Sequence, residues 1–286
     1  MGRRMRSPML SNKMRYLSPV LLLVAASGRL AIAEEPAVHH SRAEMEQFLL
    51  NAEVLQRKGI GQGVTNSEKA LLSDGKLQHE AHIQSIDVQN NSFSSSRGTE
   101  LNFKDSYKYN IAAYRLDKIM DLNMIPVSVV RKVAGKTSAV TWWVDDKMFD
   151  DVDRKKQGID PPDQDGWNKQ MYVVRVFDQL IYNTDRNLGN LVIDKQWRMW
   201  MIDHTRAFRL QTKLLNEKNL VMCDRRLLAS MRKLDQETLE EQLLPFLTKG
   251  EVKALLTRRD LIVKFFDNAV KEKGEGAVLY DMPPRQ

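Results

Sequence analysis

The spacing of apolar residues changes once along this chain, near residue 145, and that change limits the folds open to it. Before it, apolar segments bounded by turn residues predict two hairpins, with strands at residues 70–72, 81–87, 127–133 and 138–144. After it, from residues 169–182 onward, the spacing is helical. A β-rich part joined to a helical part predicts an α+β chain with two lobes, a small one over residues 41–145 and a helical one over residues 146–286.

Two helices and one loop complete the expectation for the first lobe. Ser41 and Glu44 have the spacing of a capping box, and the apolar stripe that follows, carried to Leu55, predicts a helix. Residues 105–121 also have helical spacing. Residues 89–100 are polar and rich in serine, so we expect a loop there.

The first 33 residues have the pattern of an export signal. A basic stretch is followed by an apolar run at residues 20–26 and by an Ala-x-Ala pattern at residues 31–33. The run is shorter than the roughly 20 residues that span a bilayer, so no stable transmembrane span is expected. We predict a signal peptide over residues 1–33, a linker over residues 34–40 and an exported protein, periplasmic or secreted. An uncleaved anchor, or an internal start at Met14 that keeps the protein cytoplasmic, is the alternative.

The net charge of +7 belongs to this leader. Of 44 basic residues six lie in residues 1–33, where there is no acidic residue, which leaves 38 basic against 37 acidic residues in the remainder. A nearly neutral body argues against nucleic acid as a partner.

The segment from residue 178 to residue 204 carries the candidate chemistry. Asp185 follows a predicted buried helix, and Asn190 comes five residues later, directly before a short apolar strand. A turn and a second apolar strand lead to Asp203. If the two strands pair around a four-residue turn at residues 195–198, Asn190 lies directly opposite Asp203, and their Cα atoms are about 4.5–5.5 Å apart.

An amide oxygen and a carboxylate at neighbouring strand ends suit a hard cation such as Mg²⁺. A second carboxylate, Asp185, is close enough to orient an attacking hydroxyl group. Phosphoryl transfer needs both parts, a cation on the phosphates and a carboxylate on the acceptor. Any one of these residues alone is as well explained by a turn, but the whole arrangement favours chemistry.

The run Asp185-Arg-Asn-Leu-Gly-Asn190 followed by Ile202-Asp203 resembles the catalytic and metal-binding motifs of atypical kinases, in particular the phosphoinositide 3/4-kinase-like proteins and the HipA-like kinases. The resemblance implies a β-rich lobe over a helical lobe with ATP between them. It implies Asp185 as the catalytic aspartate, Asn190 and Asp203 as ligands of Mg²⁺, and ATP as co-substrate. An unknown protein or small molecule would supply the hydroxyl acceptor.

The resemblance also assigns the ATP-binding positions of the first lobe. Gly59, Gly61 and Gly63 would form a glycine-rich loop over the phosphates, and Val144, after Trp142 and Trp143, would contact the adenine. Such kinases carry a phosphate-binding lysine where this chain has Gln84, and its glutamate partner where this chain has Asn110.

The replacement of that ion pair leaves two matters open. A glutamine and an asparagine can hydrogen-bond to each other without a buried charge. Another cation would then bind the phosphates, and Lys69 and Arg206 are the candidates. Otherwise the chain is a catalytically weak pseudokinase that acts as a nucleotide-binding scaffold. An adenylyltransferase on the same fold is a further alternative.

Overall fold

The β-rich part of the chain is built on one antiparallel sheet. In the computed structural model, which describes residues 40–61, 67–95 and 98–285, its strands run in the order β1 (Glu53–Gly59), β2 (Glu68–Ser73), β3 (Gln78–Gln84), β7 (Lys136–Trp142) and β6 (Ser128–Val133). The two predicted hairpins, β2–β3 and β6–β7, are confirmed. The proposed signal peptide, and the linker up to residue 39, lie outside the described residues.

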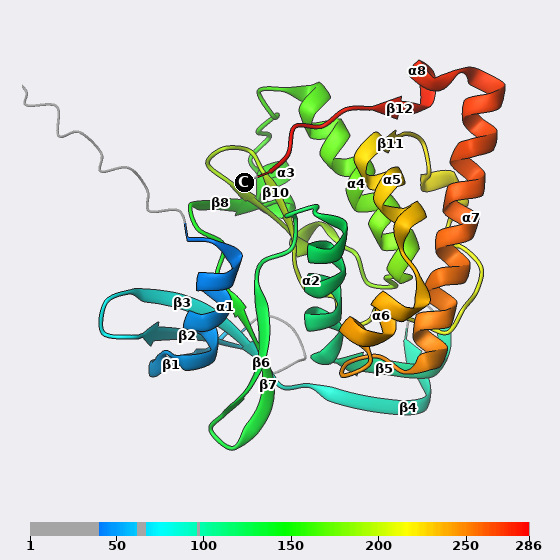
Figure 1. Cartoon of the computed structure of the whole chain (residues 1–286). Helices are drawn as coiled ribbons and strands as arrows, with labels where there is room; N and C mark the ends of the chain where they lie inside the picture. Colours follow the sequence, from blue (N-terminus) through cyan, green and yellow to red (C-terminus); the bar gives the residue numbers. More distant parts are fainter. Residues whose placement is uncertain (1–39, 62–66, 96–97, 286) are drawn as a thin grey trace, which may run out of the picture. The chain divides into compact units, whose positions relative to one another are not determined.

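Two helices pack against β6 and β7 (Figure 1). Helix α1 (Arg42–Asn51) has the predicted capping box of Ser41 and Glu44. It ends four residues before Leu55, because strand β1 begins at Glu53, so the expectation of a helix as far as Leu55 is wrong. Helix α2 (Lys108–Met120) buries Ile111, Ala112 and Leu116, among others, as its spacing predicts.

The expectation of a loop over residues 89–100 is also wrong. Strands β4 (Asp87–Ser95) and β5 (Gly98–Ser106) form a long antiparallel hairpin between β3 and α2. Figure 1 shows the hairpin extending away from the five-stranded sheet toward helix α7 (Lys249–Lys273). Lys104 on the hairpin forms an ion pair with Glu251 of α7, with an Nζ–Oε1 distance of 2.7 Å. The hairpin therefore joins the two parts of the fold.

The second part is mainly helical and contains the hairpin predicted around residues 195–198, together with a strand at residues 147–150 that was not expected. A small antiparallel sheet has the order β10 (Met199–Met201), β9 (Leu191–Asp194) and β8 (Lys147–Asp150). The helices are α3 (Asp151–Lys156), α4 (Gln164–Ile181), α5 (Arg225–Lys233), α6 (Gln236–Leu243), α7 and α8 (Glu275–Val278). Helices α4, α5 and α6 all pack on α7. None of the helices in the described ranges is long and apolar enough to cross a membrane.

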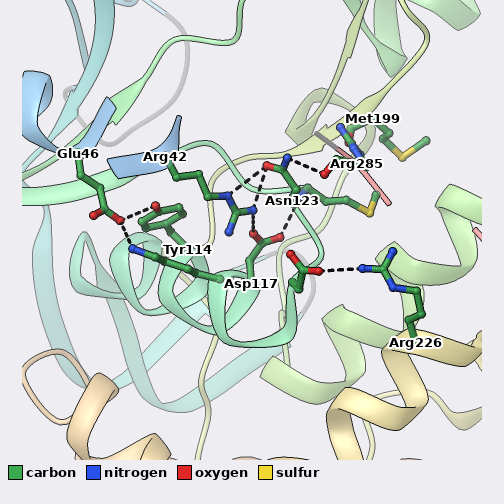
Figure 2. A network of polar contacts seen from close by, with 11 residues as sticks. Arg42, Glu46, Tyr114, Asp117, Asn123, Met199, Arg226 and Arg285 are labelled. Carbon is green, nitrogen blue, oxygen red and sulfur yellow. Dashed lines mark hydrogen bonds and ion pairs between the residues drawn. The ribbon is translucent and has the colours of Figure 1, made fainter. Parts of the chain in front are cut away.

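Helix α2 is held by polar contacts from distant parts of the chain (Figure 2). Buried Asp117 on α2 accepts a hydrogen bond from Nη2 of Arg42 on α1 at 2.5 Å. The same guanidinium bonds to Oδ1 of Asn123, whose side-chain amide donates to the backbone oxygen of Arg285 at 3.2 Å. Arg285 in turn donates to the backbone oxygen of Met199 on β10 at 2.6 Å. The position of α2 is thus fixed by both the first described helix and the last described residues.

Candidate functional site

A cavity of about 440 Å³ lies between the five-stranded sheet and the segment that follows α4. One wall comes from the sheet and from residues 141–144 that leave it, and the other from residues 185–206. Asp185, Asn190 and Asp203 all line this cavity, as does Val144. The residues that the sequence assigned to catalysis and metal binding are therefore brought to one place.

Asp185 is presented to the cavity by the way helix α4 ends. Tyr182 adopts a left-handed backbone conformation (φ +52°) that terminates the helix. The next residue, Asn183, is buried and donates its side-chain amide to Oδ1 of Asp178 at 3.0 Å. Its own Oδ1 accepts the backbone N–H of Asp185 at 3.1 Å. A buried amide thus holds the backbone of Asp185 against the helix that precedes it.

Arg186 connects this loop to the strands that carry the metal-binding candidates. Its guanidinium makes two bonds to the carboxylate of Asp178, at 2.9 and 3.1 Å. Nη1 donates to the backbone oxygens of Asn190 and Ile202, both at 2.9 Å. One side chain therefore ties helix α4, the loop and the ends of β9 and β10 together, with a charge-assisted fork at its centre.

The register of the β9–β10 hairpin differs from the prediction by one residue. Leu191 pairs with Met201, and the backbone oxygen of Asn190 accepts from the N–H of Ile202 at 3.1 Å, so Asn190 lies opposite Ile202 and not opposite Asp203. The loop is three residues long because the Asp194 carboxylate accepts the N–H of Arg198 at 2.9 Å and closes the turn early. Asp203 follows one residue beyond the pair, still at the cavity.

Asp203 has an unusual backbone and an unfavourable electrostatic setting. Its φ of +53° lies in the left-handed region, where residues other than glycine are uncommon. Burial, with added repulsion from the carboxylates of Asp105 and Asp185, raises its pKa above the usual range. Thr205 is its hydroxyl donor, at 3.1 Å. A carboxylate in this setting is stabilised in its charged form by a nearby cation.

Asp105 is a third carboxylate at the cavity, and the sequence analysis did not single it out. It lies on β5, where its buried Oδ1 has no hydrogen-bond partner and its Oδ2 accepts from Nε of Arg206 at 3.1 Å. The backbone N–H of Ser106 bonds to the oxygen of Thr205, which holds this strand end beside Asp203. The only signal in the sequence is an acidic residue two positions after Phe103, on the same face of a strand, and the segment was not expected to be a strand.

These residues fit a magnesium ion. The unpartnered Oδ1 of Asp105, the carboxylate of Asp203 and the amide oxygen of Asn190 are all hard oxygen donors at one cavity. Within the described ranges no three His, Cys, Asp or Glu side chains form a ready-made metal cluster. Few protein ligands are typical for Mg²⁺, which usually keeps waters and binds substrate phosphates as well.

The wall formed by the sheet and residues 141–144, called the upper wall below, contrasts with the acidic lower wall formed by residues 185–206. Gln84 is buried behind the cavity lining, and its Oε1 accepts from Nδ2 of Asn110 at 2.6 Å, as the sequence predicted for a neutral pair. Oδ1 of Asn110 accepts the backbone N–H of His204 at 2.7 Å. The amide pair therefore connects β3, α2 and the residue after Asp203 without a buried charge.

The glycine-rich turn is only partly described. Gly59 and Gly61 are exposed and flank Ile60, which lines the cavity. Gly63 lies outside the described residues. A Cβ added to Gly59 or Gly61 would meet no atom within 4 Å, so neither glycine is required by local packing.

Of the two candidate cations, Arg206 lines the cavity and Lys69 does not belong to its lining. Lys69 forms an ion pair with Glu80 at 2.6 Å and lies 4.3 Å from the centre of the Trp143 ring. His204 is buried and accepts a hydrogen bond from Nη2 of Arg186, so its Nε2 carries no proton. Burial and Arg186 hold the pKa of His204 well below its usual value, which fits a structural role.

The chain has a kinase-like fold, in which a cavity lies between a β-rich and a helical part and Asp185, Asn190 and Asp203 lie on its helical side. No family model and no curated protein matches the sequence. Among solved structures, hydra Fam20 with sugar matches with a TM-score of 0.63 and 15% identity, over 84% of this chain and 92% of that one.

The Golgi casein kinase matches with a TM-score of 0.58 and 11% identity, over 85% of this chain and 78% of that one. The Helicobacter pylori proinflammatory kinase CtkA matches at a TM-score of 0.43 and 12% identity, over 79% and 98% of the two chains. The first two comparisons show that the chain has a kinase-like fold. They do not confirm the specific likeness to phosphoinositide 3/4-kinase-like or HipA-like proteins.

Proposed function

We propose that this protein transfers the γ-phosphate of ATP to a hydroxyl group on a protein or a small molecule. The observation that carries the proposal is the meeting of Asp185, Asn190 and Asp203 at one cavity of a kinase-like fold, held together by Arg186. Phosphoryl transfer depends mainly on position and electrostatics, and this network supplies position.

The roles follow from the contacts. Asn190, Asp203 and the newly identified Asp105 would hold Mg²⁺, which offsets the negative charge of the phosphates when it is bound. Asp185 orients the acceptor hydroxyl and accepts its proton, a contribution of about 10²–10⁴-fold for a general base. Asn183 and Arg186 fix the backbone around Asp185, so the carboxylate is in place before the acceptor arrives.

The nucleotide would lie against the upper wall. Residues 142–144 line the cavity where the first lobe meets the second, a position suited to the adenine, with Val144 as the apolar contact. The turn through Gly59, Gly61 and Gly63 would cover the phosphates. In this proposal residues 41–145 form the smaller lobe and residues 146–286 the helical lobe, and residues 1–33 direct export. The Golgi casein kinase among the matched structures is compatible with a secretory location.

The experiment is transfer of label by the purified full chain, incubated with Mg²⁺ and either γ- or α-labelled ATP. We expect γ label on the chain itself or on an added hydroxyl-bearing acceptor. Asp185→Asn and Asp203→Asn should each lower transfer by at least about 100-fold, since each removes a charge but keeps the shape of the side chain. Asp160→Asn changes an exposed aspartate and is the matched control.

The neutral Gln84–Asn110 pair favours one rival, a pseudokinase that binds nucleotide without transferring it. That rival predicts a rise in melting temperature with Mg²⁺ and ATP but no transfer of either label. Transfer of α label would identify an adenylyltransferase instead. Absence of both transfer and nucleotide binding would overturn every version of the proposal.

A further inference from the structure

Within the described part of the chain, the cavity lining has few positive charges with which to bind a nucleotide. Its lining includes four residues that carry or can carry a positive charge, namely His82, Lys147, His204 and Arg206. The position where atypical kinases carry a lysine is Gln84, which is already bonded to Asn110. A triphosphate is usually bound by a cationic side chain besides its metal, and among the described residues of the lining these four are the candidates.

The two histidines are neutral at physiological pH. Burial lowers the pKa of His82 to about 4. His204 is buried, and its unprotonated Nε2 accepts a hydrogen bond from the guanidinium of Arg186. Both therefore contribute hydrogen-bonding capacity but no charge, which leaves Lys147 and Arg206.

Lys147 is exposed at the start of β8, so its flexible side chain is solvated. Arg206, in contrast, is fixed at both ends. Its backbone oxygen accepts from the hydroxyl of Thr184 at 3.0 Å, which anchors it next to Asp185. Its guanidinium lies over the rings of Phe93 and Phe103, 5.7 and 5.2 Å from their centres. Aromatic faces orient the planar group and leave its N–H edges for hydrogen bonds.

Those N–H edges point at the catalytic carboxylates. Nε bonds to Oδ2 of Asp105 at 3.1 Å, and Nη1 lies 3.8 Å from Oδ2 of Asp185. The Arg206 side chain is only 23% exposed. It therefore lies between two of the carboxylates proposed to act on the nucleotide and its acceptor, within reach of any phosphate group bound beside them.

We infer that Arg206 is the phosphate-binding cation of this cavity. It takes the role of the lysine that atypical kinases carry at the position of the uncharged Gln84. The inference rests on the proposed function, because it concerns the same nucleotide. Arginine is always charged and presents paired N–H donors that match two phosphate oxygens. In the absence of nucleotide, the same group offsets the repulsion among Asp105, Asp185 and Asp203.

The test compares the affinity of the full chain for Mg²⁺–ATP and for adenosine, measured by calorimetry. Arg206→Gln should weaken Mg²⁺–ATP binding by about 10- to 100-fold, the equivalent of losing hydrogen bonds to a charged group, and change adenosine binding by less than about threefold. Arg206→Lys keeps the charge without the fork and should lose about 3- to 10-fold. Lys69→Gln and Lys147→Gln should bind both ligands as the unchanged protein does.

The outcomes separate this inference from the proposed function. If the unchanged protein binds Mg²⁺–ATP and both Arg206 variants bind it equally well, the inference fails and the proposed function stands. A loss confined to Lys69→Gln or Lys147→Gln assigns the role elsewhere and overturns it too. If the unchanged protein binds no nucleotide, both fall. Melting curves establish that each variant is folded, and should Arg206→Gln not fold, the Lys variant decides alone.

Discussion

The two walls of the cavity differ in how their buried polar side chains are paired. Charged groups are buried together on and behind the lower wall. Arg206 lies between Asp105 and Asp185 in the lining, and behind it Arg186 binds Asp178. On the upper wall, a neutral amide pair, Gln84 with Asn110, occupies the equivalent junction of strand and helix. The buried polar groups therefore have partners at both junctions. The partners form ion pairs at the lower wall and an uncharged hydrogen bond at the upper wall.

The difference teaches where charge is needed for function and where it is only one way to fill a site. A buried ion pair is often no more stabilising than a neutral pair of similar shape, although the loss of one partner is costly. The upper junction therefore keeps its structural role without a lysine. Under the proposed function the lower wall must stay charged, because metal binding and hydroxyl orientation would depend on its carboxylates.

The largest effect is expected on the lower wall. Arg186→Ala removes the fork to Asp178 and the bonds to the oxygens of Asn190 and Ile202. It leaves Asp178 as a buried carboxylate without a counter-charge, although Asn183 still donates to it, so the free energy of unfolding should fall by about 3–5 kcal/mol in urea titration. Arg186→Lys keeps the charge and should lose less. A change below about 1 kcal/mol for Arg186→Ala would show that these contacts of Arg186 do not stabilise the fold.

The matching test on the upper wall introduces a buried charge instead of removing one. Gln84→Lys places an ammonium opposite Asn110 in a buried site and should lower the free energy of unfolding by about 3 kcal/mol. Adding Asn110→Glu supplies the missing partner and should recover at least half of that loss. Additive losses in this double-mutant cycle would mean that the two side chains are not coupled, contrary to the observed 2.6 Å bond.

A smaller effect is expected from the neutral histidine of the upper wall. The folded-state pKa of His82 is about 4, against 6.5 for the free side chain, so the unfolded chain binds more protons between these values. The free energy of unfolding should therefore rise with pH from about 4 to about 6.5. His82→Gln should remove about 1–2 kcal/mol of that rise, since the side chain is only partly buried.

Urea titrations at pH 5 and pH 7, with and without His82→Gln, measure this difference. His204 is present in both proteins, so its contribution cancels. An identical pH dependence in the two proteins would show that His82 is not held neutral by burial.

The smallest effect is expected at Lys69. Its ion pair with Glu80 joins two side chains that are 36% and 48% exposed, and such pairs contribute at most about 1 kcal/mol. Lys69→Gln should change the free energy of unfolding by no more than that, and less at high salt. A loss above about 2 kcal/mol would mean that its cation–π contact with Trp143 stabilises the fold more than its ion pair with Glu80 does.

What the sequence predicted well was local. The capping box of α1, the two sheet hairpins and the run from Asp185 to Asn190 each depend on residues close together in the chain. The meeting of Asp185, Asn190 and Asp203 at one cavity was predictable for the same reason, because one continuous segment supplies the loop, both strands and Asp203. The Gln84–Asn110 contact followed from a resemblance, with the burial of charge as its physical reason.

What the sequence did not show depends on tertiary contacts. The one-residue shift of the β9–β10 register follows from the side chain of Asp194, which closes a shorter turn than strand spacing alone suggests. The β4–β5 hairpin has a polar sequence, and it is supported by the stacking of Phe93 on Phe103 and by Lys104 bound to α7. Asp105 was missed because its strand was missed.

The polar contacts around helix α2 have a consequence for how this fold comes apart (Figure 2). Arg42 and Arg285 lie near opposite limits of the described chain, yet both are linked to Asn123, directly after α2, and Arg42 is also linked to Asp117 on it. Trimming either end therefore loosens the helix that carries Asn110, and with it the support of the backbone beside Asp203. Proteolysis at either end would therefore disturb the backbone at the cavity without any cleavage in the cavity itself.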